Sequence, residues 1–212
     1  MIDRQSKGKT MTIKDAKTNF IIDETLGLLL NRSIADVTVR DIAVRAGVGE
    51  ATVYRYFSTK HNLVCAAATK LGKQIFETYF DLSQASNGGE KLALFYASYL
   101  KIFCSHREFF KFINEFDAYM ISEGKTDSNE YASGLDNFKE LCSEAYTQGV
   151  ADGSIAPVSD WETFYYATTH ALLELCKKLS TADIVRQDCG ANKEEEIATL
   201  TEIILYKLKF KN

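Results

Sequence analysis

Apolar residues recur along most of the chain at alternating steps of three and four positions. The longest stripe consists of Trp161, Tyr165, Thr168, Leu172, Leu175 and Leu179. Such a set lines one face of a helix with 3.6 residues per turn, and no comparable run alternates with a period of two. The pattern predicts an all-α fold of about nine helices. A single proline among 212 residues agrees with long, uninterrupted helices.

Glycine and small polar residues interrupt the helical pattern at four places. These are Asn87–Gly89, residues 122–128, the stretch from Asp152 through Gly153 and Pro157 to Asp160, and residues 181–192. Such groups stop helices, form loops and cap the next helix. We expect two domains, an N-terminal domain of residues 1–60 and a helical domain of residues 61–212.

Residues 38–57 combine the features of a helix-turn-helix. Thr38 and Asp41 have the spacing of a capping box, which marks the start of a helix. Ala43 is small enough for two helices to cross closely, and Gly47 tolerates the positive φ of a tight turn. An αα-corner with a glycine turn is the alternative interpretation of the same spacing.

The second helix of this motif, about residues 50–56, carries side chains that suit DNA. Threonine and arginine can contact base edges, and tyrosine and lysine commonly bind phosphates. We expect Thr52 and Arg55 to read bases and the tyrosines and lysines to hold the backbone. The candidate DNA-binding residues are Lys17, Thr38, Arg40, Ala51, Thr52, Tyr54, Arg55, Tyr56 and Lys60.

The charge is unevenly distributed. Residues 1–60 hold ten Lys and Arg against seven Asp and Glu, whereas residues 61–212 hold fifteen against twenty-two. A basic first quarter on an acidic remainder suggests that the N-terminal part meets a polyanion. The excess of three charges is small, and chance is the other explanation.

These residues resemble the tetracycline-repressor (TetR) family of bacterial transcription regulators over about residues 18–63. The resemblance is carried by Thr38–Ala43, Ala46–Val48, Thr52–Phe57, Lys60 and Leu63. It implies a three-helix DNA-binding head on a larger helical body that dimerises through its last two helices. It further implies a repressor that binds a palindromic operator and is released by a small ligand. Gly49 stands where the family usually has serine, Ser33 where it usually has glycine, and Glu50 brings an acid near the DNA.

Aromatic residues are concentrated in the body, where twelve of 25 lie between Phe76 and Tyr119. Aromatic rings either wall apolar pockets or fill a core, and both possibilities stay open. The candidate ligand-binding residues are Tyr99, Phe103, Phe112, Phe116, Tyr119, Phe138, Cys142, Tyr165, Thr168 and His170. Because the body is acidic, we expect a neutral or cationic hydrophobic ligand. His170 and Glu174 share a helix face, which suits a surface or interface pair better than a metal site.

The Trp161–Leu179 stripe and a last helix at about residues 193–209 are expected to form a homodimer interface. Five scattered cysteines, residues 65, 104, 142, 176 and 189, predict reduced thiols in the cytoplasm and no zinc site. We expect no signal peptide, membrane span, cofactor or catalytic motif. The alternatives are an all-α carrier or enzyme with an accidental helix-turn-helix resemblance, and a regulator controlled by a protein partner.

Overall fold

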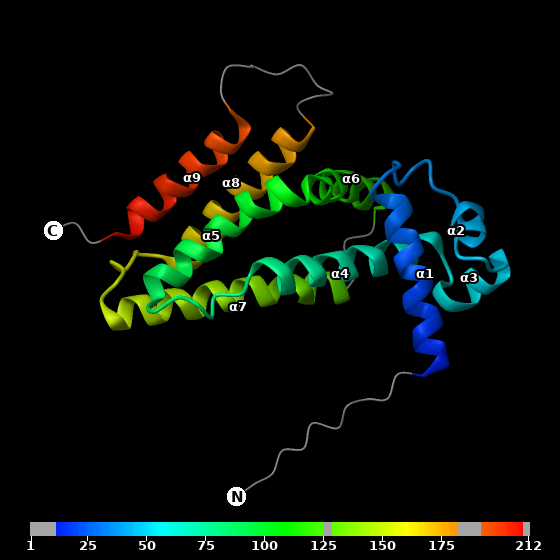
Figure 1. Cartoon of the computed structure of the whole chain (residues 1–212), viewed down its shortest axis with the longest axis horizontal. Coiled ribbons are helices and arrows are strands. Elements are labelled where there is room, and N and C mark those ends of the chain that lie inside the picture. The colour runs from blue at the N-terminus through cyan, green and yellow to red at the C-terminus, as the bar shows by residue number, and fades with distance from the viewer. Residues whose placement is uncertain (1–11, 125–128, 182–191, 210–212) are drawn as a thin grey trace, which may run out of the picture. The chain divides into compact units, whose positions relative to one another are not determined.

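The computed structural model describes residues 12–124, 129–181 and 192–209, and these form nine α-helices without a strand (Figure 1). The helices are α1 (Ile13–Leu29), α2 (Val39–Arg45), α3 (Glu50–Phe57), α4 (Lys60–Tyr79), α5 (Gly88–Ser105), α6 (Arg107–Glu123), α7 (Asn129–Asp152), α8 (Trp161–Ser180) and α9 (Lys193–Leu208). The predicted all-α fold and the helix count are confirmed for this part of the chain.

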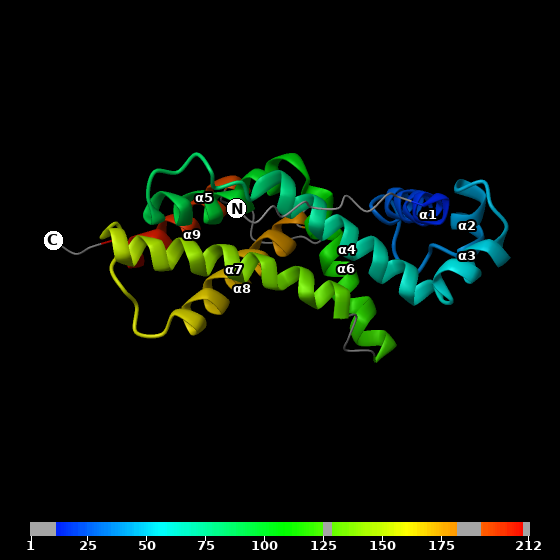
Figure 2. The ribbon, with the colours of Figure 1, turned by 90° about the horizontal axis from the view of Figure 1, so that it is seen from below.

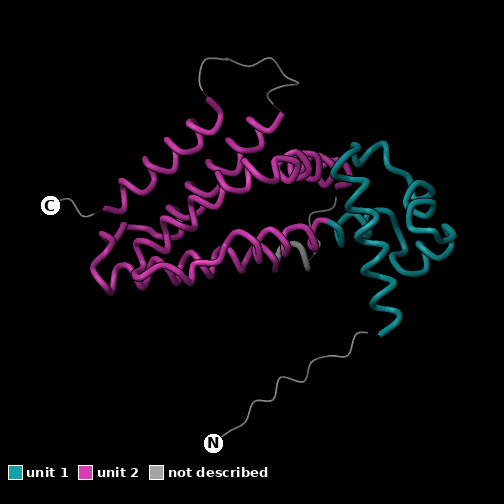
Figure 3. Tube along the Cα trace, in the orientation of Figure 1, with its two compact units in different colours: residues 1–67 teal, residues 68–212 magenta. Residues whose placement is uncertain are grey.

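The chain divides into two compact units, residues 1–67 and residues 68–212 (Figure 3). The division falls within α4, so that one helix belongs to both units. The sequence predicted a boundary after residue 60, which is the first residue of α4. The two compact units divide later in that helix, after residue 67.

In the first unit, α2 packs against both α1 and α3. Side chains from each segment meet in its core, where Ile21, Val37, Ile42 and Leu63 have no exposed surface. Capping boxes begin both α1 and α2, because Thr12 and Thr38 each bond reciprocally with the aspartate three positions later. The core and the caps together hold three short helices that could not persist alone.

In the second unit, α5 is the central helix and packs against α6, α7, α8 and α9 (Figures 1 and 2). Its residues Phe95, Tyr96 and Phe103 are fully buried. The last turns of α4 lie against α7, where the rings of Phe76 and Phe138 meet edge to face with centroids 4.8 Å apart. Much of the aromatic cluster expected in the body is therefore core.

The Asn87–Gly89 break lies where the sequence predicted a helix boundary, at the end of the segment 80–87 that separates α4 from α5. Asn87 caps α5, and Gly88 lies in its first turn. A Cβ atom on Gly88 would lie 2.0 Å from the backbone nitrogen of Gly149, so glycine is needed where α5 crosses α7. The side chain of Asp152 accepts a hydrogen bond of 2.8 Å from the Gly88 amide and fixes the crossing.

The apolar stripe of α8 faces the core of its own chain. Tyr165, Leu172 and Leu179 are buried, and the other members of the stripe are half-buried. They are covered because α8 packs against α5, α6 and α9. Because three of its six residues are only half-buried, the chain covers the stripe in part, and its role in a homodimer interface stays a prediction.

Two of the other predicted breaks agree with the structure. Gly124 ends α6 with a left-handed backbone, and Gly153, with φ of 77°, follows the end of α7. Asp160 then caps α8 by accepting from the Thr163 amide. Residues 125–128 and 182–191, which include Cys189, lie outside the described part of the chain, and the four described cysteines are unbridged. None of the described helices is long and apolar enough to cross a membrane.

Candidate functional site: a helix-turn-helix and a helical cavity

The turn between α2 and α3 has the geometry expected from its sequence. Gly47 adopts φ of 61°, and the Val48 amide donates to the Ala43 carbonyl over 2.9 Å. Gly49 caps α3 without a side-chain hydrogen bond. Glycine at Gly47 thus permits the sharp reversal, while the absence of a hydroxyl at Gly49 leaves the first amides of α3 uncapped by a side chain.

One face of α3 is anchored and the other is open. Val53 and Phe57 are buried in the first unit, which fixes the orientation of the helix. Ala51, Tyr54 and Arg55 are exposed, and Thr52 and Tyr56 are half-buried. The Arg55 guanidinium lies 5.5 Å from the centre of the Tyr56 ring. None of the five α3 residues predicted to contact DNA is therefore among the buried residues that anchor the helix.

The candidate residues on α1 and α2 are also exposed. Lys17, Thr38 and Arg40 all have open side chains. The hydroxyl of Thr38 is already engaged, because it donates to Asp41 Oδ2 over 2.8 Å and accepts from the Asp41 amide over 3.1 Å. The amide of Thr38 also donates to this carboxylate, which lowers the pKa of Asp41.

Lys60 has a structural contact that its position in the sequence did not indicate. Its ammonium donates to the Ile34 carbonyl over 2.6 Å. Thr59 caps α4 by accepting from the Asn62 amide over 3.1 Å. Ser58 instead ends α3 with φ of 63°.

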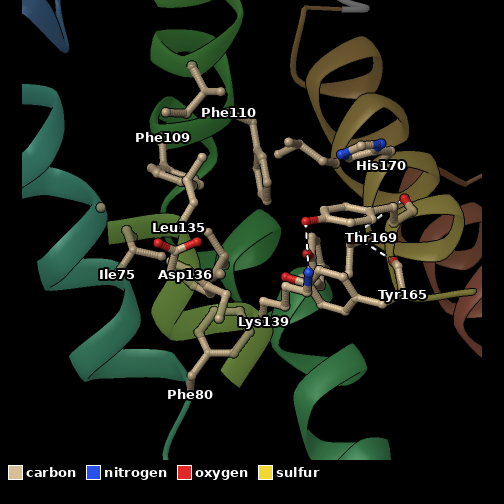
Figure 4. A pocket seen from close by; sticks show the side chains of 17 residues that line it. Ile75, Phe80, Phe109, Phe110, Leu135, Asp136, Lys139, Tyr165, Thr169 and His170 are labelled. Atoms are coloured by element: carbon tan, nitrogen blue, oxygen red, sulfur yellow. Dashed lines mark hydrogen bonds between the residues drawn. The ribbon is translucent and has the colours of Figure 1, made fainter. Parts of the chain in front are cut away.

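The second unit contains a cavity of about 340 Å³, at the lower end of the size of small-molecule sites (Figure 4). Residues of α4, α5, α6, α7 and α8 line it. They are Gly72, Ile75, Phe80, Tyr99, Ile102, Phe109, Phe110, Ile113, Leu135, Asp136, Phe138, Lys139, Tyr165, Tyr166, Thr169, His170 and Leu173. Most of these side chains are apolar or aromatic, so the cavity suits a hydrophobic guest.

Only some of the side chains expected to bind a ligand line this cavity. Tyr99, Phe138, Tyr165 and His170 do so. The remaining expected residues do not, and they are Phe103, Phe112, Phe116, Tyr119, Cys142 and Thr168. Fully buried Cys142 lies in the core, and the hydroxyl of Thr168 bonds to that of Tyr96 over 2.8 Å.

The aromatic side chains of α6 explain the difference. Phe112 and Phe116 stack on each other within the core, with ring centres 5.9 Å apart. The neighbouring face, with Phe109 and Ile113, lines the cavity instead. Phe109 and Ile113 are four positions apart, as are the core-facing residues Phe112 and Phe116. The sequence around them therefore does not show which pair faces the cavity.

Charged groups lie along one side of the cavity. The ammonium of Lys139 donates to Glu162 and, over 3.1 Å, to the Tyr166 hydroxyl. These contacts, chiefly the one with Glu162, raise the pKa of Lys139. Asp136 is exposed at the same edge and has no ion pair with any described residue.

The suggested pairing of His170 with Glu174 does not form a shared site. His170 lines the cavity, whereas Glu174 binds Lys177 over 2.6 Å. The described residues contain no group of three His, Cys, Asp or Glu side chains arranged to hold a metal ion.

Comparison with known proteins finds a protein-family model that matches a large part of the first unit. Residues 21–67 match the model of bacterial regulatory proteins of the tetR family. An uncharacterised HTH-type transcriptional regulator of Mycobacterium tuberculosis is 38% identical over 55 residues, which are 26% of this chain and 26% of that protein. The match thus spans about a quarter of the length of such curated relatives.

Solved structures of similar fold extend over both units. The fatty acid degradation regulator FadR from Bacillus halodurans has a TM-score of 0.68 and 17% identity, covering 89% of this chain and 94% of its own. FadR from Bacillus subtilis, in complex with stearoyl-CoA, has a TM-score of 0.66 and 17% identity, covering 89% and 98%. The ketosteroid regulator KstR2 of M. tuberculosis has a TM-score of 0.54 and 15% identity, covering 92% and 96%. At these identities the likeness concerns the fold alone.

Proposed function

We propose that the chain is a member of the tetR family of bacterial regulatory proteins, whose model matches residues 21–67, and that it is a ligand-responsive transcriptional repressor that binds a palindromic operator as a homodimer. The observation that carries the proposal is the open face of α3 behind a glycine turn. A protein that recognises DNA in this way acts where the chromosome lies, so we place it in the cytoplasm. We assign it no catalytic activity.

The recognition helix is α3. Its buried anchors, Val53 and Phe57, leave the opposite face free to enter a major groove. Thr52 and Arg55 are assigned to base edges, and Tyr54 and Tyr56 to phosphates. Lys17, Arg40 and Lys60 are assigned to the backbone of the DNA, and Thr38 and Ala51 border the contact.

The experiment that tests this function is selection of duplex DNA by the purified protein, followed by affinity measurements over a range of salt concentrations. We expect a selected sequence with two-fold symmetry, because a symmetric dimer binds two half-sites. The logarithm of the affinity should fall linearly with that of the salt concentration as phosphate contacts release counterions. An all-α carrier or enzyme with an accidental helix-turn-helix would select no sequence and would show little salt dependence.

The dimer is assigned to the outer faces of α8 and α9. Ile203 and Tyr206, one turn apart on α9, are 62% and 70% exposed. Large apolar side chains left open in this way are typical of a protein interface. On α8, which packs against α9, the small residues Ala167 and Ala171 are also exposed and permit close approach of another helix. Sedimentation at micromolar concentration should show a dimer that Tyr206→Glu dissociates.

The cavity of the second unit is assigned to the inducer. A body controlled by a protein partner would need no internal cavity, so the volume of about 340 Å³ favours a small molecule. The apolar lining and the acidic body favour a neutral or cationic hydrophobic ligand. Such a ligand can release DNA only if it binds the DNA-free conformation better, and a coupling of about 1–3 kcal/mol would weaken operator binding about 5- to 150-fold.

A further inference from the structure

Two tyrosine residues that line the cavity have hydroxyl groups with no hydrogen bond to any residue that the structure describes. Tyr165 is only 6% exposed and Tyr99 is partly buried, both line the cavity, and neither hydroxyl bonds to a described residue. Tyr165 is visible at the cavity wall in Figure 4. Neighbouring tyrosines differ, because the hydroxyl of buried Tyr96 bonds to Thr168 and that of exposed Tyr166 accepts from Lys139.

Both hydroxyls are donors at neutral pH. Burial raises the pKa of Tyr99 well above its ordinary value of 10.0, and burial likewise raises the pKa of Tyr165. Each phenol therefore keeps its proton, and both residues belong to the cavity lining. A hydrogen-bond acceptor on a ligand would pair with these two hydroxyl groups. A ligand with such an acceptor should therefore bind much more tightly than a similar ligand without one.

The charged groups at the edge do not provide a free site for an anion. The Lys139 ammonium is the only lysine or arginine among the lining residues, and it is already held by Glu162 and Tyr166. The Asp136 carboxylate is exposed, so water screens its attraction for a cation. The buried polar groups of the cavity are thus better matched to a neutral acceptor than to an ion.

We propose that the cavity binds a neutral apolar molecule with a ketone or ester carbonyl, whose oxygen accepts hydrogen bonds from Tyr99 and Tyr165. This inference rests on the ligand-responsive function proposed above and names the class of ligand. The carbonyl supplies two lone pairs for the two donors, and the aromatic and aliphatic lining covers the remainder of the molecule.

The test is a titration with four probes of similar length: 2-undecanone, undecane, decanoate and decylammonium. Trp161 is the only tryptophan of the chain, and its ring lies 6.5 Å from that of Tyr165, so its fluorescence reports occupancy. We expect 2-undecanone to bind the dimeric full-length protein more tightly than the other three probes.

Removing one hydroxyl at a time locates the carbonyl. Tyr99→Phe and Tyr165→Phe keep the rings, and each should weaken 2-undecanone about 2- to 12-fold, the effect of one hydrogen bond. Neither change should weaken undecane. Tyr96→Phe is the matched control, because that hydroxyl is buried but bonds to Thr168 and does not line the cavity. It should leave the preference for the ketone unchanged.

Three results would overturn the inference. They are equal affinity for the ketone and the alkane, tighter binding of either ion, and a ketone preference that survives both phenylalanine variants. With any of these, a probe still binds, so a ligand-responsive regulator would stand with another ligand class. If no probe binds while sequence-specific DNA binding persists, the inference fails together with the assignment of the cavity to an inducer. Loss of DNA binding itself would contradict the proposed function.

Discussion

The ammonium of Lys60, the first residue of α4, donates a hydrogen bond of 2.6 Å to the backbone carbonyl of Ile34. Ile34 is buried. Lys60 therefore ties the loop after α1 to the start of α4.

Replacing Lys60 with alanine should have two effects. The free energy of unfolding should fall by about 1–2 kcal/mol, because the Ile34 carbonyl loses its donor. The affinity for DNA should fall equally for all duplexes. The salt slope, which is the slope of the logarithm of affinity against the logarithm of salt concentration, should decrease by about one per subunit. Lys17→Ala is the control, since its exposed side chain should change the salt slope without changing stability. An unchanged salt slope for Lys60→Ala would leave Lys60 with the structural role alone.

Replacing Arg55 or Thr52 with alanine should change which operator sequence is preferred. Each base contact is worth about 1–3 kcal/mol of discrimination. Tyr54→Phe, which removes only an exposed hydroxyl, should instead weaken all duplexes alike, since phosphate contacts carry no sequence information. Repeating the selection of duplex DNA with each variant checks this. A changed consensus for Tyr54→Phe would show that the roles are misassigned.

Gly88→Ala should destabilise the second unit by about 1–3 kcal/mol, because its new methyl group would overlap the backbone of Gly149. Gly149→Ala should cost less, since the nearest obstacle is the movable end of the Ile155 side chain. Gly134→Ala meets no atom within 4 Å and should stabilise α7 by about 0.5–1 kcal/mol. Denaturant unfolding of the three variants measures the order of their stabilities. Equal stability of Gly88→Ala and Gly134→Ala would refute the close crossing of α5 and α7.

Gly72→Leu should fill the cavity. Gly72 lines it from α4, and a Cβ atom there meets nothing within 4 Å. Binding of 2-undecanone should weaken about tenfold or more through overlap with the new side chain, while operator binding without a ligand stays the same. Gly134→Leu, also in open space but away from the cavity lining, is the matched control. Unchanged binding by Gly72→Leu would place the ligand site elsewhere.

The hydrogen bond from the Gly88 amide to Asp152 should make stability depend on pH. Hydrogen bonds from the Ser154 hydroxyl and the Gly88 amide lower the pKa of Asp152 below its ordinary value of 3.8. A lowered pKa means that the contribution to stability is present above 3.8 and is lost as the pH falls through the lower folded value. The melting temperature of the native chain should therefore exceed that of Asp152→Asn at pH 6, and the gap should narrow below about pH 4. A gap that is constant with pH would contradict this.

The helix-turn-helix was readable from the sequence because its determinants are local. The bonds between Thr38 and Asp41 join residues three positions apart, and the positive φ of Gly47 is a property of a single residue. The burial of Val53 and Phe57 follows from their spacing on one helix face. Interactions of such short range are nearly the same in any fold that contains the segment.

The tertiary structure decided which partners the helix faces meet. Periodicity shows that α6 has apolar stripes, but only packing turns Phe112 into the core and Phe109 toward the cavity. Packing likewise covers part of the α8 stripe within one chain and brings Lys60 to a carbonyl 26 positions away. The sequence alone determined the helices, their caps and the recognition motif, since backbone hydrogen bonds and side-chain periodicity act over a few residues. The position of the cavity and its unpaired hydroxyls depends on how five helices pack together, which no single segment encodes.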